Sequence, residues 1–198
     1  MSFLLGLTGS IGMGKSTTAQ MFAEEGCPVW DADAAVHRLY SLGGDAVGPV
    51  GQIFPKALKN DQIDRAVLKH LISENPDILR RLEQVVHPLV GQDRANFIKQ
   101  HQDDDIIVLD IPLLYETNAH TWLDGVAVVS TTADIQRERV LARPGMDQAS
   151  FDLILARQMP DQDKRDRADW VIPTDNLDKA RAAVRKICAQ IKVNISHA

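Results

Sequence analysis

The sequence predicts an α/β fold in which five mostly parallel strands form a doubly wound sheet with helices on both faces. Short runs rich in Val, Ile and Leu alternate along the chain with longer segments of helical periodicity, a pattern typical of strand and helix units in a parallel sheet. The 198 residues, 44% apolar and 25% charged, suit one ordinary globular domain. The chain is therefore long enough to bury a substantial core without a disulfide or a structural metal.

Five apolar runs predict the strands of this sheet. We expect them near Phe3–Thr8, Pro28–Trp30, Ile106–Asp110, Gly125–Ser130 and Trp170–Ile172. Four helical segments support the sheet, and they span about residues 14–25, 34–42, 133–142 and 177–192. Strands and helices in this order build a doubly wound core.

A second group of helices fills the long gap between the second and third strands. We expect these helices at Asp64–Ile72, Pro76–Val85 and Pro88–Gln102. Pro76 and Pro88 would then lie in the first helical turn, where proline is favoured. An excursion this long between neighbouring strands indicates a substrate-binding lobe rather than a loop. Residues 43–104 are therefore expected to form an inserted helical lobe.

A second excursion, residues 144–167, is dense in charges and contains Pro144-Gly145 and Pro160 as helix breakers. This pattern predicts a mobile helical lid. The core that holds the sheet is then expected to consist of residues 1–42, 105–143 and 168–198.

The overall charge and the lack of long apolar segments exclude several classes of function. The formal net charge of −5 argues against a general binder of nucleic acid or membrane surfaces. No apolar stretch approaches the roughly 20 residues needed to cross a bilayer. Cys27 and Cys188 are far apart in sequence and form neither a metal-ligand spacing nor a redox pair. These observations favour a reducing compartment, and we expect a cytoplasmic protein with no membrane or nucleic-acid partner.

The strongest motif is the segment Gly9-Ser10-Ile11-Gly12-Met13-Gly14-Lys15-Ser16, which follows the first strand and precedes a helix. This is the pattern of a phosphate-binding loop, or P-loop, in its required context. A glycine-rich turn that only caps a helix is the alternative, and ordinary residue frequencies would give the pattern by chance in roughly 1% of chains of this length. The segment therefore predicts the P-loop NTPase fold and a nucleoside triphosphate ligand.

Each part of the P-loop has a physical role. Its glycines let main-chain N–H groups turn toward phosphate oxygens without a side chain in the way, and the following helix aims its positive end at the same anion. Lys15 is expected to reach the β- and γ-phosphates, Ser16 to bind Mg²⁺, and Thr17 to donate to the α-phosphate. The expected nucleotide contacts are Gly9, Gly12, Met13, Gly14, Lys15, Ser16 and Thr17.

The second strand ends in Asp31-Ala32-Asp33, and ligands of open α/β sheets lie at the carboxyl ends of strands. A carboxylate there can accept the proton of an attacking hydroxyl and orient it toward the γ-phosphorus. The alternative is that one of the two aspartates merely caps the following helix. For Asp33, the residues alone leave both roles open.

The third strand also ends in an acid, Asp110, as a Walker B strand does. Such a carboxylate is expected to hold Mg²⁺ through water. An aspartate in an ordinary turn after the strand is the alternative. The P-loop upstream favours the magnesium role.

Taken together, these segments resemble the dephospho-coenzyme A kinase family over nearly the whole chain. The matching segments are Leu7–Thr17, Asp31–Asp33, Ile63-Asp64-Arg65 with Leu68, Leu82-Glu83, His87-Pro88 and Asp110–Glu116, followed by Gln136, Arg139, Arg143, Gln158, Lys164 and Ala168-Asp169. The first of them is common to P-loop proteins. The segments His87-Pro88 and Asp110-Ile111-Pro112-Leu113-Leu114-Tyr115-Glu116 are far more specific.

The resemblance implies a kinase that uses ATP and Mg²⁺ to phosphorylate the ribose 3′-hydroxyl of dephospho-coenzyme A, the last step of coenzyme A biosynthesis. It implies that Asp33 is the catalytic base and that the helical lobe binds the acceptor. The acceptor site would be lined by Asp33, Arg65, His87, Asp110, Pro112, Leu113, Leu114 and Glu116. Without the resemblance, local packing before a helix that starts at Pro88 is the favoured explanation of His87.

Two arginines, Arg139 and Arg143, lie four residues apart at the entry to the expected lid, on one helical face. Phosphoryl transfer depends on positioning and on stabilising the charge of the transferred group. A closing lid would bring both guanidinium groups to the phosphates and exclude water. We expect both to be catalytic and Arg143 to bind the nucleotide as well, with solvated surface arginines as the alternative.

One segment departs from the family pattern. After Ala168–Ile172 the chain reads Pro173-Thr174-Asp175-Asn176, where an asparagine and then a glycine are usual near the adenine. The adenine contacts of residues 172–176 are therefore not predicted.

Two other functions remain open at this point. A nucleoside monophosphate kinase would share the fold and the lid, but the segment Asp110–Glu116 counts against it. A non-catalytic nucleotide-dependent switch is the other, although the chain has no Asn-Lys-x-Asp motif of the kind that recognises guanine. A monomer or a small homo-oligomer is compatible with the sequence.

Overall fold

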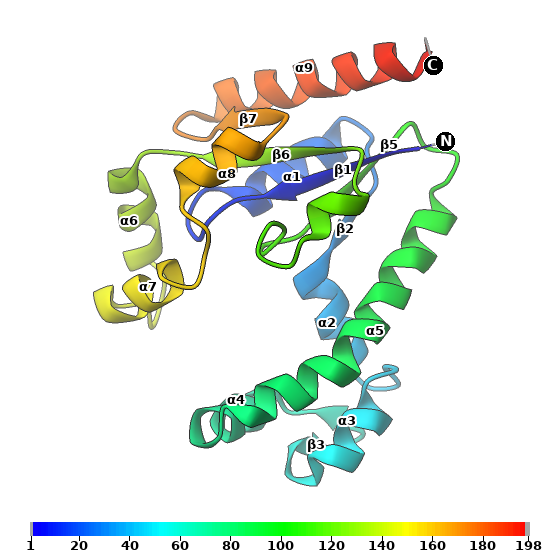
Figure 1. Ribbon diagram of the computed structural model, residues 1–198, viewed down its shortest axis with the longest axis vertical. Coiled ribbons are helices and arrows are strands. Elements are labelled where there is room, and N and C mark those ends of the chain that lie inside the picture. Colours follow the sequence, from blue (N-terminus) through cyan, green and yellow to red (C-terminus); the bar gives the residue numbers. More distant parts are fainter. Residues whose placement is uncertain (1, 197–198) are drawn as a thin grey trace. The chain divides into compact units, whose positions relative to one another are not determined.

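The computed structural model describes residues 2–196, and its contacts divide the chain into two compact units (Figure 1). The first unit contains the chain up to Trp30 and from His101 onward, and the second is the continuous segment Asp31–Gln100. Our expected boundaries for the inserted lobe were residues 43–104. The division therefore assigns residues 31–42 to the second unit, whereas the sequence suggested that they belong to the core.

The sheet has five strands, and all five predicted strands are present. They are β1 (Phe3–Thr8), β2 (Val29–Asp31), β5 (Ile106–Asp110), β6 (Gly125–Ser130) and β7 (Trp170–Pro173). Their order is β2-β5-β1-β6-β7, and β1 pairs in parallel with both β5 and β6, while β6 pairs in parallel with β7. Every residue of β5 and β6 is buried, as expected for strands inside a parallel sheet.

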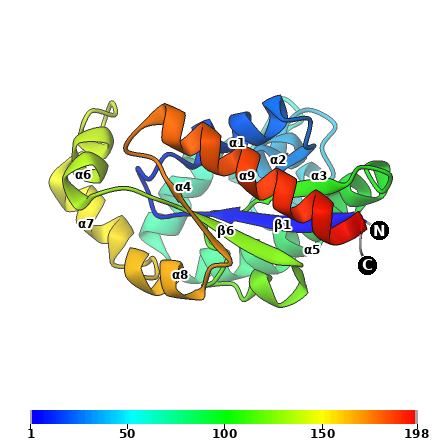
Figure 2. The same ribbon diagram turned by 90° about the horizontal axis from the view of Figure 1, so that it is seen from above.

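Helices of the first unit cover both faces of this sheet. They are α1 (Lys15–Glu24), η2 (Ala119–Trp122), α6 (Ala133–Leu141), α7 (Gln148–Leu155), α8 (Asp161–Arg167) and α9 (Leu177–Ser196). Figure 2 shows α1 and α9 on one side of the sheet and α8 on the other. The main apolar cluster joins Leu5, Phe22 and Val184, which come from β1, α1 and α9. The doubly wound prediction is confirmed.

The second unit is mainly helical and has its own apolar core. Its elements are α2 (Ala32–Tyr40), α3 (Val47–Ile53), η1 (Pro55–Ala57), β3 (Leu58–Lys59), β4 (Gln62–Ile63), α4 (Arg65–Glu74) and α5 (Asp77–Gln100). Leu39 and Tyr40 of α2 pack in one cluster with Phe54, Leu68 and Val86. We expected the helix near residues 34–42 to support the sheet, but its buried face belongs to this second core.

The expected helix start at Pro88 is wrong. A single helix, α5, runs from Asp77 to Gln100 with Pro88 inside it. Proline removes one N–H donor and crowds the preceding turn, but the apolar stripe continues on both sides of it, through buried Leu82 and Val86 and partly buried Leu89. Packing of this stripe therefore outweighs the local preference of proline for a helix start.

The two cysteines, which the sequence gave no reason to pair, meet in the core of the first unit. The Sγ atoms of Cys27 and Cys188 are 3.8 Å apart, and both side chains are buried. The contact arises because α1 packs against α9, where Arg185 of α9 also binds Glu25 at 2.8 Å. The hydrogen bond with Cys188 lowers the pKa of Cys27 below its ordinary value despite the burial.

No helix within residues 2–196 is both long enough and apolar enough to span a bilayer.

Candidate functional site

The carboxyl ends of the parallel strands gather the polar residues of the first unit at one edge of the sheet. β1 ends at Thr8 and leads into the P-loop, and Leu7 lies opposite Asp110, the last residue of β5. β6 ends at Ser130, and Thr174 follows β7. This edge is where open α/β sheets bind their ligands.

The P-loop adopts a conformation that requires its glycines. Gly12 and Gly14 have φ values of 78° and 89°, in the left-handed region that glycine favours. A Cβ atom on Gly12 would lie 2.5 Å from Cγ2 of Val140 and 3.0 Å from the carbonyl oxygen of Gln136. Gly14 is also the N-cap of α1, so the free N–H groups of that helix open onto the loop.

At the end of the loop, Lys15 forms an ion pair with Asp110. The carboxylate is almost fully buried, with 1% of its side chain exposed, while the lysine keeps 17%. Removing one partner would leave the other charge poorly compensated in a desolvated place. The two residues that the sequence assigned to phosphate and magnesium binding are thus brought together.

Ser16 and Thr17 are exposed in the first turn of α1. A hydroxyl from Ser16 and a carboxylate from Asp110 are both hard oxygen donors, and Mg²⁺ commonly takes only one or two protein ligands beside water and phosphate. The residues therefore fit a magnesium ion that is shared with a bound nucleotide. Among residues 2–196, no cluster of three or more His, Cys, Asp or Glu side chains is placed to hold a metal by itself.

Arg139 is joined to the P-loop through Thr174. Its guanidinium group donates to the carbonyl oxygen of Thr174 at 2.7 Å, and the hydroxyl of Thr174 donates to the carbonyl oxygen of Met13 at 2.7 Å. Thr174 is buried, and its side chain would contact a Cβ atom on Gly14 at 3.2 Å. The segment that departs from the family pattern therefore supports the phosphate loop directly.

Arg143 lies beyond the end of α6 rather than on its helical face, because α6 ends at Leu141 with Ala142 as its cap. The Arg143 side chain is exposed and has no ion-pair or hydrogen-bond partner within residues 2–196. Arg139 and Arg143 therefore differ: the side chain of Arg139 is bound to the residue that supports the loop, and the side chain of Arg143 is exposed to solvent.

The segment after β5 turns back along the sheet edge. The hydroxyl of Thr8 donates to the carbonyl oxygen of Pro112 at 3.1 Å, which ties this segment to β1. Leu114 is fully buried and Leu113 is 41% exposed, so of the two expected leucine contacts only Leu113 presents a free apolar surface. Leu114 packs in the interior.

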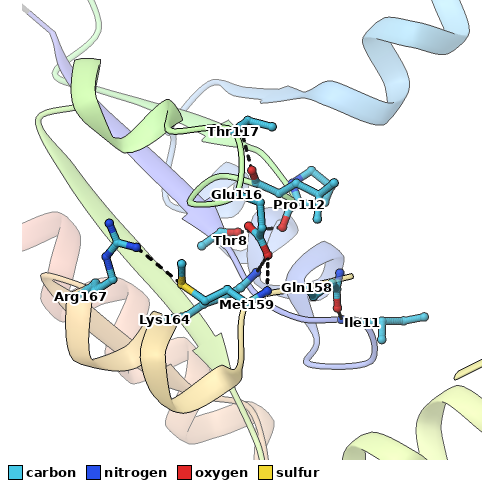
Figure 3. A network of polar contacts seen from close by, with 10 residues as sticks. Thr8, Ile11, Pro112, Glu116, Thr117, Gln158, Met159, Lys164 and Arg167 are labelled. Atoms are coloured by element: carbon cyan, nitrogen blue, oxygen red, sulfur yellow. Dashed lines mark hydrogen bonds and ion pairs between the residues drawn. The ribbon is translucent and has the colours of Figure 1, made fainter. Parts of the chain in front are cut away.

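Glu116 makes the most extensive contacts of this segment (Figure 3). Its Oε1 accepts the N–H of Met159 at 2.7 Å and lies 2.9 Å from Nζ of Lys164. Burial raises the pKa of Glu116, but the ion pair with Lys164 and the hydrogen bond from Met159 outweigh burial and hold the pKa below its ordinary value. Glu116 is therefore an ionised structural anchor in this unit.

The expected lid is tied to the sheet along part of its length. Besides the contacts of Met159 and Lys164 with Glu116, Asp161 of α8 accepts a hydrogen bond from the hydroxyl of Ser130 at 2.7 Å. These contacts hold α8 against the sheet. Of the segment 144–167, the part around α7 is then the better candidate for a mobile lid.

The second unit contains the other expected acceptor residues. Asp31 caps α2, because its Oδ1 accepts the N–H of Ala34 at 2.9 Å. Asp33 is exposed in the first turn of that helix and has no side-chain partner within residues 2–196. His87 is exposed on α5, so local packing does not explain it.

Arg65, the first residue of α4, lines a pocket of about 530 Å³ in the second unit. His37, Tyr40 and Lys59 contribute to the same pocket. Lys59 is paired with Asp64 at 2.7 Å, which leaves Arg65 as the cation of the pocket that no described carboxylate neutralises. Such a pocket can accept an anionic group.

The sequence patterns assign no role to Lys164, which pairs with Glu116, or to Gln136, Gln158 and Thr174, which contact the P-loop. The first three belong to the resemblance only as matching positions. Lys164 lies in the mostly charged run Asp161–Arg167, and nothing local distinguishes this fully buried lysine from its exposed neighbours. Burial of this kind arises from tertiary packing.

Comparison with known proteins gives consistent matches. The family model described as "Dephospho-CoA kinase" matches residues 3–179. A dephospho-CoA kinase of Ruegeria pomeroyi is 56% identical over 198 residues, covering all of both chains. A crystal structure of a Thermus thermophilus protein has a TM-score of 0.85 at 30% identity, covering 96% of this chain and 97% of that one. A dephospho-CoA kinase from Campylobacter jejuni shares the fold, with a TM-score of 0.68 at 21% identity and the same coverage.

Proposed function

The chain belongs to the dephospho-CoA kinase family, and from this premise we infer that it transfers the γ-phosphoryl group of ATP to the ribose 3′-hydroxyl of dephospho-CoA, giving CoA and ADP. The observation that supports this most strongly is the P-loop between β1 and α1 with Lys15 paired to Asp110 at the sheet edge. A cytoplasmic setting, where ATP is abundant, is part of the proposal.

The P-loop binds the polyphosphate through its main-chain N–H groups. The left-handed glycines Gly12 and Gly14 keep these groups free of side chains, and the N-terminus of α1 adds the positive end of its dipole. Lys15 moves from Asp110 toward the β- and γ-phosphates when the nucleotide binds. A cation at this place stabilises the charge that is spread over the transferred group.

Magnesium is expected to be held by Ser16 and, through water, by Asp110, and when bound it neutralises phosphate charge. Arg139, fixed through Thr174, would lie beside the phosphates. Arg143 would approach them as the segment around α7 closes and excludes water. Positioning of this kind supplies most of the catalysis in phosphoryl transfer.

The acceptor hydroxyl is expected to lose its proton to Asp33. Asp31 already caps α2, so Asp33 has no structural role that competes with the role of base. The second unit, with Arg65 in its pocket, is proposed to bind the acceptor, whose diphosphate suits a cationic pocket. The family resemblance further implies His87, Asp110, Pro112, Leu113, Leu114 and Glu116 as acceptor residues, and of these Leu114 is buried in the interior.

An acceptor assay tests the proposed function. Purified protein is incubated with ATP, Mg²⁺ and dephospho-CoA, and the products are measured as ADP and as the new 3′-phosphate by ³¹P NMR. Parallel reactions contain AMP, CMP or UMP, or no acceptor. The proposal requires ADP and CoA in equal amounts with dephospho-CoA; faster turnover of a nucleoside monophosphate, or ADP formation that no acceptor stimulates, would contradict it.

A further inference from the structure

Ile11, near the tip of the P-loop, has both of its main-chain polar groups held by glutamine side chains. Its N–H donates to Oε1 of Gln158 at 3.0 Å, and its carbonyl oxygen accepts from Nε2 of Gln136 at 2.7 Å. Figure 3 shows the contact between Gln158 and Ile11. Because Gly12 and Met13 follow directly, any rotation of the main chain at Ile11 changes the direction of the N–H groups that face the phosphates.

The two glutamines are held in different ways. Gln136 is buried on α6, where helical hydrogen bonds fix its main chain. Gln158 lies between α7 and α8, outside any helix, and its N–H donates to the carbonyl oxygen of Leu155 at the end of α7 at 3.0 Å. The next residue supplies a second anchor, because the N–H of Met159 donates to Oε1 of Glu116 at 2.7 Å.

The anchor is strengthened by Lys164, which has no exposed surface and lies 2.9 Å from the same oxygen of Glu116. A buried ammonium group is strongly unfavourable without its partner. Segment 158–164 therefore cannot slide along Glu116 without leaving this charge unpaired. The ion pair fixes the register of the segment that presents Gln158 to the P-loop.

We propose that Gln158 is a positioning residue of the phosphate loop, held in place by the ion pair between Glu116 and the buried Lys164. One network of polar contacts then connects the segment after β5 with the start of α8 and the tip of the P-loop (Figure 3). The expected effect on nucleotide binding rests on the proposed kinase function. The expected effect on the conformation of the P-loop is independent of that function.

The direct test is amide hydrogen exchange of Ile11, followed by NMR in ¹⁵N-labelled protein without nucleotide. In Gln158→Ala the Ile11 N–H loses its acceptor, and its exchange should become about three- to tenfold faster, as expected for one lost hydrogen bond. Gln158→Glu keeps an acceptor oxygen and should retain most of the protection. The matched control is Gln162→Ala, an exposed glutamine on α8, which should leave Ile11 unchanged.

Kinetics separate positioning from general stability. Gln158→Ala should raise the KM for ATP by about three- to tenfold and leave the KM for the acceptor and the melting temperature close to wild type. Gln158→Glu should recover part of the ATP affinity. An Ile11 amide that exchanges at the wild-type rate in Gln158→Ala, or equally fast in Gln162→Ala, would overturn the proposal. Since exchange needs no substrate, this result stands even if the protein makes no CoA.

The role of the ion pair is tested with Glu116→Gln, which keeps the acceptor for Met159 but removes the charge. Ile11 exchange should again increase. If this variant does not fold, the double replacement Glu116→Leu with Lys164→Met removes both charges together and restores an apolar interior. A folded double variant in which Ile11 keeps its wild-type protection would show that the pair does not position Gln158.

Discussion

At the scale of single residues, several side chains have roles that depend on being desolvated. Asp110 and Lys164 are almost completely buried, and they form ion pairs with Lys15 and Glu116 respectively. Charges in such places have few alternative partners, so they define the geometry around them. Asp33 is the opposite case, an exposed carboxylate without a partner in the described part of the chain, as a base that must meet a substrate requires.

Asp33→Asn tests the base. Loss of the proton acceptor should lower kcat by about 10²- to 10⁴-fold, while the KM for ATP stays near wild type because the P-loop is untouched. Steady-state kinetics with both substrates provide the measurement. Asp31→Asn is the matched control, since asparagine keeps the cap on α2 and should leave kcat nearly unchanged. Equal losses in both variants would argue against a specific role for Asp33.

The contribution of Glu116 to stability should depend on pH. Its folded-state pKa lies below the ordinary value, so the stabilisation is complete above about pH 4.3 and is lost as the pH falls through the lower, folded-state pKa. The difference in melting temperature between wild type and Glu116→Gln should therefore be largest near neutral pH and shrink below about pH 4. Glu138→Gln, at an exposed position on α6, should show little difference at any pH. A melting-temperature difference between wild type and Glu116→Gln that grows as the pH falls would contradict this assignment.

At the scale of elements, local patterns predicted the strands and the P-loop because apolar runs and glycine spacing are short-range signals. Packing between distant segments was not predictable in this way. The continuation of α5 through Pro88, the association of α2 with the second unit and the approach of Cys27 to Cys188 all depend on residues far apart in sequence. The same holds for the site: the sequence identified Lys15 and Asp110, but only the structure places Gln158 against Ile11.

Pro88→Ala tests the idea that α5 tolerates its proline. Alanine restores an N–H donor within the helix and removes the crowding of the preceding turn, so the free energy of unfolding should rise by about 1 kcal/mol, less than the full cost of an interior proline because the unfolded chain gains freedom. Thermal or urea unfolding measures the change. Pro76→Ala, just before the helix, is the control and should stabilise the protein less. A less stable Pro88→Ala variant would show that the native backbone at this point depends on proline.

At the scale of the whole molecule, the first unit contains the P-loop and the second contains the pocket lined by Arg65. The two ligands should therefore protect different segments from hydrogen exchange. ADP with Mg²⁺ should slow exchange mainly within residues 9–17, and dephospho-CoA should slow it mainly within residues 58–66. Hydrogen exchange mass spectrometry with each ligand alone provides the measurement. Protection of the second unit by ADP alone, equal to that of the P-loop, would contradict this division.

The position of β1 in the sheet has a consequence for synthesis on the ribosome. β1 is made before the other strands of the sheet, yet both of its neighbours come much later: β5 ends at residue 110 and β6 at residue 130. At translation rates of about 5–20 residues per second, β1 with its apolar leucines stays unpaired for on the order of ten seconds before a partner strand is synthesised. During that interval Asp31–Gln100 can already collapse around its own core, so the lobe inserted into the middle of the chain is the part of the nascent polypeptide able to fold first.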